Sequence, residues 1–136
     1  MTQEDKELLL KDLCARLPYG VKVSVDDKHW CDFHKDIPVE LTLDNSYRIL
    51  LGVSLGYVKP YLFPLSSMTE EQSNELFTYF HNVELKEIKT SGDYLKAAHL
   101  GENAKRDWLN KNHFDYHYLI EKGLALDATG LNIYWL

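Results

Sequence analysis

The chain of 136 residues has a formal net charge of −6 and is 45% hydrophobic, which is the size and composition of a globular domain with its own core. We therefore expect residues 1–136 to form a single domain. The acidic balance disfavours nucleic acid as a partner, because phosphate backbones are bound mainly by Lys and Arg.

The compartment is predicted from cysteine content and hydropathy. Cys14 and Cys31 are the two cysteines, too few for a disulfide framework. The start of the chain lacks the apolar stretch of a secretory signal, and no run reaches the roughly 18–20 apolar residues of a membrane span. We expect a cytoplasmic protein with reduced thiols and no membrane segment.

The first predicted element is a helix that begins after Thr2. Thr2 and Asp5 have the spacing of a capping box, with Asp in place of the usual Glu. Pro18 and Gly20 end the helix. Cys14 is interpreted as a small core residue on the apolar stripe. The stripe is predicted to consist of Leu10, Leu13, Cys14 and Leu17.

An antiparallel meander of about four or five strands is predicted to follow. Residues 21–25 alternate between apolar and polar side chains, residues 29–33 can return as a second strand, and residues 39–43 resume the alternation. Residues 47–53 are the most strongly β stretch of the chain. The connections are too short for parallel crossovers. Residues 61–63 lie between two prolines, so an edge strand and an irregular segment both stay open.

The second half is predicted to be mainly helical. A capping box at residues 69–72 begins a helix that ends near Asn82, with Leu76, Phe77 and Phe80 facing inward. Residues 83–88 alternate as a strand would, and residues 90–93 form a break. Residues 94–100 fit either a strand or a helix.

A third helix is predicted over residues 102–112, with Ala104, Trp108 and Leu109 as its apolar side. The apolar residues 131–136 are expected to dock on the sheet or to pair with another subunit. The predicted fold is therefore α+β: an N-terminal helix, an antiparallel sheet and two further helices packing on one face.

Three segments resemble a group of short proteins of gut bacteria and of their phages or other mobile elements. They are residues 5–22, 59–73 and 107–129, which leave residues 29–44 and 83–105 uncovered. The group has no assigned activity, cofactor or catalytic residue. The resemblance implies an accessory role outside core metabolism and implies nothing about chemistry.

A pattern typical of a nucleophile elbow occurs at Gly52, Ser54 and Gly56. An elbow needs a helix directly after the serine, and Pro60 opposes helical geometry in the residue before it. We interpret the pattern as a strand end whose glycines allow a turn.

Two histidine patterns are candidate metal sites. His29, Cys31 and His34 are zinc-binding residue types within one segment, but no second Cys/His pair supplies a fourth ligand. His113 and His117 have the i, i+4 spacing of a helical zinc motif, but Phe114 stands where the catalytic Glu belongs. We interpret residues 113–117 as a turn with exposed histidines, and we predict no metal and no cofactor.

Aromatic side chains outside the predicted strands and helices are the best functional indication in the sequence. Residues that bury area at low entropic cost are favoured at recognition surfaces, although ordinary core filling is the competing explanation. The predicted binding surface consists of Tyr57, Tyr61, Phe63, Tyr116, Tyr118, Tyr134 and Trp135.

We therefore expect a non-catalytic accessory protein with a protein partner, a homodimer being one form of that association. The alternative is a small hydrolase or metal-dependent enzyme centred on Ser54 or on the His29, Cys31 and His34 set. A third hypothesis is nucleic-acid binding through three cations. Because Asp107 lies among them, we interpret them as a solvated helix face. They are Lys105, Arg106 and Lys111.

Overall fold

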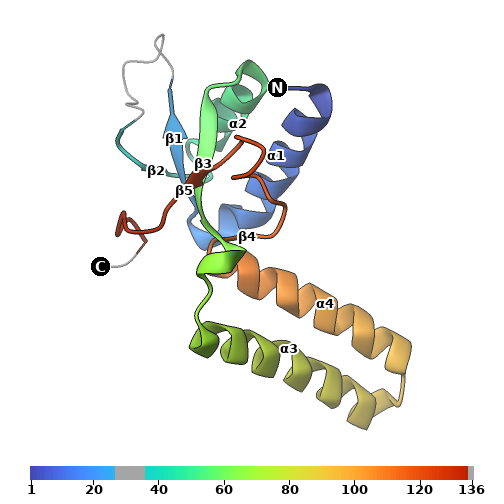
Figure 1. The fold of residues 1–136 in the computed structure, drawn as a ribbon. Coiled ribbons are helices and arrows are strands. Elements are labelled where there is room, and N and C mark those ends of the chain that lie inside the picture. The colour runs from blue at the N-terminus through green and yellow to red at the C-terminus, as the bar shows by residue number, and fades with distance from the viewer. Residues whose placement is uncertain (27–35, 135–136) are drawn as a thin grey trace.

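Four α-helices and a five-stranded mixed sheet make up the described part of the chain, residues 1–26 and 36–134 of a computed structural model (Figure 1). The predicted α+β class is confirmed. The helices are α1 (Gln3–Arg16), α2 (Ser46–Leu55), α3 (Glu70–Ser91) and α4 (Tyr94–Lys111), with 3₁₀ turns at Leu17–Tyr19 and Leu65–Ser67. The strands are β1 (Lys22–Val25), β2 (Val39–Glu40), β3 (Val58–Pro64), β4 (Phe114–Asp115) and β5 (Leu126–Asp127).

Strand β3 is the centre of the sheet. β1 pairs antiparallel with both β2 and β3. β4 and β5 pair in parallel with successive parts of β3, with Phe63 opposite Phe114 and Tyr61 opposite Leu126. The sheet is thus not wholly antiparallel, because β4 and β5 follow a long helical excursion that allows a parallel return. The segment between the two prolines is a central strand.

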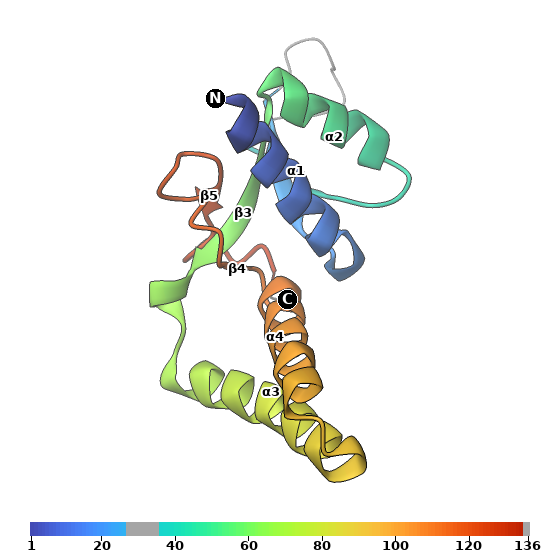
Figure 2. The same cartoon turned by 90° about the vertical axis from the view of Figure 1, so that its right-hand side faces the viewer.

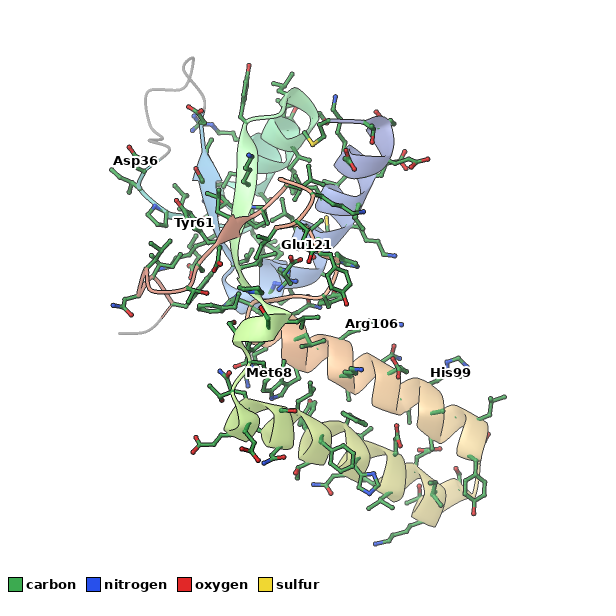
Figure 3. All side chains as sticks on the ribbon, viewed as in Figure 1. Asp36, Tyr61, Met68, His99, Arg106 and Glu121 are labelled. Atoms are coloured by element: carbon green, nitrogen blue, oxygen red, sulfur yellow. The ribbon has the colours of Figure 1, made fainter. Side chains whose placement is uncertain are left out.

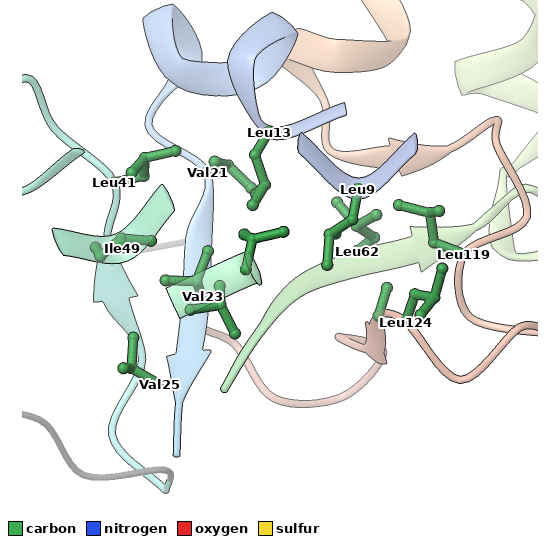
Figure 4. Packing of buried hydrophobic residues seen from close by; sticks show 13 residues of the cluster. Leu9, Leu13, Val21, Val23, Val25, Leu41, Ile49, Leu62, Leu119 and Leu124 are labelled. Atoms are coloured by element: carbon green, nitrogen blue, oxygen red, sulfur yellow. The ribbon is translucent and has the colours of Figure 1, made fainter. Parts of the chain in front are cut away.

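Helices α1 and α2 supply the helical side of the main core, which Figure 4 shows from close by. Their apolar side chains pack against the sheet and against the segment between β4 and β5. Removing these side chains from water is the main favourable term in folding. The buried members are Leu9, Leu13, Val21, Val23, Val25, Leu41, Ile49, Val53, Val58, Leu62, Leu119, Leu124 and Ala125.

The prediction of a strand over residues 47–53 is wrong, because these residues belong to α2. A short apolar run carries no periodicity that separates a buried strand from a buried helix. Gly52 is buried in α2 where a Cβ would lie 2.8 Å from Cγ2 of Val58. Gly56 ends the helix with a φ of +82°. The predicted strand over 39–43 is shortened to β2, and the one over 29–33 lies outside the described residues.

The buried face of α1 is not the predicted apolar stripe but a face turned away from it around the helix axis. The capping box of Thr2 and Asp5 is confirmed, but Leu10 and Cys14 are exposed. Cys14 is therefore not a core residue. The buried face instead alternates leucines with two charged residues, and it consists of Leu9, Asp12, Leu13 and Arg16.

Helices α3 and α4 form an antiparallel hairpin that projects from the rest of the molecule (Figures 1 and 2). Residues 83–88 are helical and not a strand, and residues 94–100 are helical as well. The break predicted over residues 90–93 is confined to its last two residues: α3 continues to Ser91, Gly92 ends it with a φ of +67°, and Asp93 caps α4. The helices that cover the sheet are α1 and α2, whereas α3 packs mainly on α4.

A second apolar cluster lies at the base of the hairpin. Its four buried members are Leu76 of α3, Trp108 and Leu109 of α4, and Phe114 of β4. The Trp108 and Phe114 rings stack with centroids 5.7 Å apart. Further out, the helices approach each other through the small residues Ala97, Gly101 and Ala104. The hairpin is thus anchored by aromatic packing at one end only.

The described part of the C-terminal segment docks on the sheet, as expected. The Tyr134 hydroxyl accepts from the Lys22 backbone N–H at 2.8 Å and donates to the Tyr61 carbonyl at 2.7 Å. The Tyr134 ring also stacks on His113, with centroids 3.7 Å apart. Tyr61, labelled in Figure 3, lies on β3 at the middle of this contact.

Gly52→Ala is expected to lower the free energy of unfolding by about 1–3 kcal/mol, because the added methyl meets Val58 in a packed core. Helix propensity alone would favour alanine by about 1 kcal/mol, so the sign of the change tests the packing. Urea unfolding supplies the measurement. Ser54→Ala, an exposed change on the same helix, is the control and should move stability by less than about 0.5 kcal/mol. A stabilised Gly52→Ala protein would contradict the contact.

Candidate functional site

A buried charged network joins α1 to the segment that follows α4. Asp12 and Arg16 are both fully buried, and Arg16 Nε donates to Asp12 Oδ1 at 2.7 Å. Arg16 Nη2 donates to the Phe114 carbonyl at 2.6 Å. His117 Nδ1 lies 2.7 Å from Asp12 Oδ2. The guanidinium also lies over the Tyr116 ring, 5.2 Å from its centroid. The network therefore gathers residues from both ends of the chain.

The protonation of this network follows from its contacts. Burial alone would raise the pKa of Asp12, but the His117 hydrogen bond and the Arg16 guanidinium lower this pKa below its ordinary value. An ionised carboxylate only accepts hydrogen bonds, so His117 Nδ1 carries the hydrogen. Nε2 of His117 is then the nitrogen left for a further partner. The His117 side chain is 21% exposed.

A cleft of about 750 Å³ lies on the solvent side of His117, between α1 and α4. Arg106, labelled in Figure 3, belongs to its α4 wall. No serine, threonine or cysteine occurs among the described residues that line it. The lining residues are Lys11, Ala15, Asn103, Arg106, Asp107, Asn110, Tyr116 and His117.

The expectation that both histidines of residues 113–117 are exposed is wrong. His113 is buried against Tyr134 with a φ of +63°, and His117 is half-buried on Asp12. Burial, together with the nearby cations Arg16 and Lys22, lowers the pKa of His113 to about 4. His113 is therefore neutral at physiological pH. The segment is a turn and a short strand, so His113 and His117 do not share a helical face.

The predicted aromatic binding surface does not lie on one exposed face. Tyr61 is buried, and Phe63 packs into the second cluster and against Tyr134, with ring centroids 5.9 Å apart. Tyr116 packs on the same cluster, and Tyr57 packs on the main core. Tyr118 is exposed, and Trp135 lies outside the described residues. Core filling accounts for most of this set.

The structure also locates the candidate chemical residues. Ser54 lies exposed in α2, so Gly52, Ser54 and Gly56 lack the strand that an elbow requires. The zinc hypothesis falls on residues outside the described part. Within residues 1–26 and 36–134, no three His, Cys, Asp or Glu side chains gather as a cation site. Lys105, Arg106 and Lys111 are exposed on α4, and the last two line different clefts.

The polar network is the feature that sequence reasoning missed. The spacing of residues 9, 12, 13 and 16 is as helical as that of the predicted stripe. Asp12 and Arg16, an i, i+4 pair of opposite charge on that face, were the available signal. Nothing local indicates the contact with His117, which is 105 positions away.

Comparison of the chain with models of known protein families, with curated protein sequences and with solved structures gave no match. None of the described helices combines the length and apolar character needed to cross a bilayer.

Asp12→Asn is expected to lower the free energy of unfolding by about 3 kcal/mol or more, because it leaves the Arg16 charge buried without its counter-ion. Urea unfolding near neutral pH measures the loss. Asp107→Asn, the same change at an exposed position, should cost less than about 0.5 kcal/mol. Equal losses in the two variants would show that the buried pair has no special role.

His113 predicts a stability loss in mild acid. Its pKa is about 4 when folded and 6.5 as an ordinary value, so only the unfolded chain takes up the proton between these pH values. Stability is therefore full above pH 6.5 and falls by about 3 kcal/mol as the pH drops to 4. His113→Asn, a residue that tolerates positive φ, should reduce this fall, whereas exposed His99→Asn should not. Parallel pH profiles for wild type and His113→Asn would refute the assignment.

Proposed function

We propose that the protein is a non-catalytic cytoplasmic binding protein, that α3 of the projecting hairpin is its protein-binding surface, and that its partner is a second copy of the chain. The observation that carries the proposal is an apolar stripe along the outer side of α3. The resemblance to proteins of mobile elements is compatible with such an accessory role but supplies no chemistry.

The stripe consists of Phe77, His81 and Leu85, which follow one another at i, i+4 and i+8 on one helical face. Phe77 is 57% exposed and Leu85 is 38% exposed. The Phe77 ring stacks on His81 with centroids 5.2 Å apart and meets Phe80 edge-on at 5.4 Å. These ring contacts hold the stripe in one arrangement before any partner binds, which lowers the entropic cost of association.

The position of the stripe favours association over core packing. The hairpin projects from the body (Figures 1 and 2), and α3 buries its other side against α4. Scattered exposed apolar residues are normal, whereas aromatic and aliphatic side chains that continue along one helix face mark interaction sites. Aromatic residues are also enriched in interface cores, and charged residues are depleted there.

The charges flanking the stripe favour a second copy in antiparallel orientation. Acidic Glu70, Glu71 and Glu75 lie exposed in the first half of α3, and basic Lys86 and Lys89 lie exposed in the last half. The last half also holds two glutamates, but both are turned towards α4: Glu84 lies against Gly101, and Glu87 pairs with Lys96 at 3.4 Å. A two-fold axis near His81 would place Phe77 of one copy opposite Leu85 of the other. It would also bring the acidic end of each α3 beside the basic end of its partner, as self-complementary interfaces require.

Phe77→Ser combined with Leu85→Ser should convert a dimer into a monomer, because the centre of the interface loses its apolar contacts. Sedimentation velocity over a concentration series measures the mass, with 15.9 kDa expected for one chain. Leu95→Ser is the control, since Leu95 is 74% exposed and lies off the stripe.

The wild type and Leu95→Ser should both sediment as dimers. A wild type that stays monomeric at its highest soluble concentration would overturn the proposal. A Leu95→Ser protein that dissociates as fully as the double variant would also overturn it, because the loss would then not depend on the stripe.

A further inference from the structure

The cleft between α1 and α4 carries more positive than negative charge, although the whole chain is acidic. Lys11 of α1 and Arg106 of α4 lie on its exposed walls, against one acidic lining residue, Asp107. The carboxylate of Asp12 lies behind the cleft and is already paired with Arg16. Two cations that line one cleft from two elements attract an anion more strongly than an isolated surface lysine would.

The floor of the cleft offers positioned polar groups. Asp12 fixes the ring of His117 through Nδ1, so that Nε2 is free for a partner. Asn110 lines the cleft at 4% exposure, and its Oδ1 is buried without a hydrogen-bond partner among the described residues. A buried acceptor left unpaired costs about 1–3 kcal/mol, which a ligand hydroxyl or amino group would offset. Asn103 adds a second amide to the lining.

We infer that this cleft binds a small polar anion, one that carries a carboxylate or phosphate group held by Lys11 and Arg106 and a hydroxyl or amino group held by His117 and Asn110. Its volume of about 750 Å³ lies within the range of small-molecule sites, about 300–1,000 Å³. The site is independent of the α3 stripe, because the α4 residues that line it belong to the other helix of the hairpin.

Titration of the full-length protein with ribose 5-phosphate, gluconate and uncharged ribose tests the inference. NMR resonances of the His117 imidazole report contact with the cleft, and isothermal titration gives the Kd. At least one of the two anions should bind and shift His117, and ribose should do neither. The two anions distinguish a phosphate site from a carboxylate site.

Arg106→Gln should weaken binding of that anion by about tenfold or more, the effect of losing one charge-assisted hydrogen bond. Lys105→Gln removes the same charge from the neighbouring exposed residue, which does not line the cleft, and should leave Kd within about twofold. The Phe77→Ser, Leu85→Ser protein should bind the anion as the wild type does.

Three results would overturn the inference. The first is that neither anion shifts the His117 resonances, and the second is that ribose binds as well as the anions. The third is that Lys105→Gln weakens binding as much as Arg106→Gln, which would indicate general surface charge. Because the test does not depend on sedimentation, a failure here is distinguishable from a failure of the dimer.

Discussion

The fully buried guanidinium of Arg16 is the constraint on which the arrangement of the molecule depends. A charge without water or a partner costs several kcal/mol. Asp12 on the same helix neutralises it, but the Phe114 carbonyl and His117 complete the network from the far end of the chain. The bonds to the Phe114 carbonyl and to His117 therefore form only when the segment after α4 docks on α1. That docking sets where α4 leaves the body, and with it the direction of the hairpin.

The same docking creates the cleft. Its walls come from α1, α4 and the Tyr116–His117 segment, the parts that the network holds together. Asp12 serves both sides, since it neutralises Arg16 beneath the cleft and orients the imidazole within it. The α3 stripe lies on a different helix, whose small-residue contact with α4 leaves one apolar face uncovered. Ligand binding and association can thus be altered separately, one through α4 and the other through α3.

Signals confined to a few residues predicted structure well. The capping boxes at Thr2 and Thr69 and the break at Gly92 and Asp93 fall where the sequence indicates. The sequence prediction was wrong where tertiary packing determines the secondary structure. Residues 47–53 are as compatible with a buried strand as with a buried helix, and Gly52 against Val58 is a contact that no local pattern contains. Of the aromatic set, Phe63 and Tyr116 pack at the base of the hairpin, Tyr57 packs on the main core, and Tyr61 is buried in β3.

The candidate site was missed for a further physical reason. Hydrophobic periodicity assumes that Asp and Arg face water, so it favours a buried face with Leu10 and Cys14 over one that contains Asp12 and Arg16. The pair is buried because each charge cancels the other and because Arg16 Nη2 and Asp12 Oδ2 find partners more than 90 positions away. These long-range hydrogen bonds cannot be predicted from one segment of the sequence. Taken alone, each of the residues would be expected to lie exposed on the surface. His117, one half of the candidate helical metal motif, is instead an imidazole held by Asp12, because Asp12 and not His113 is its hydrogen-bond partner.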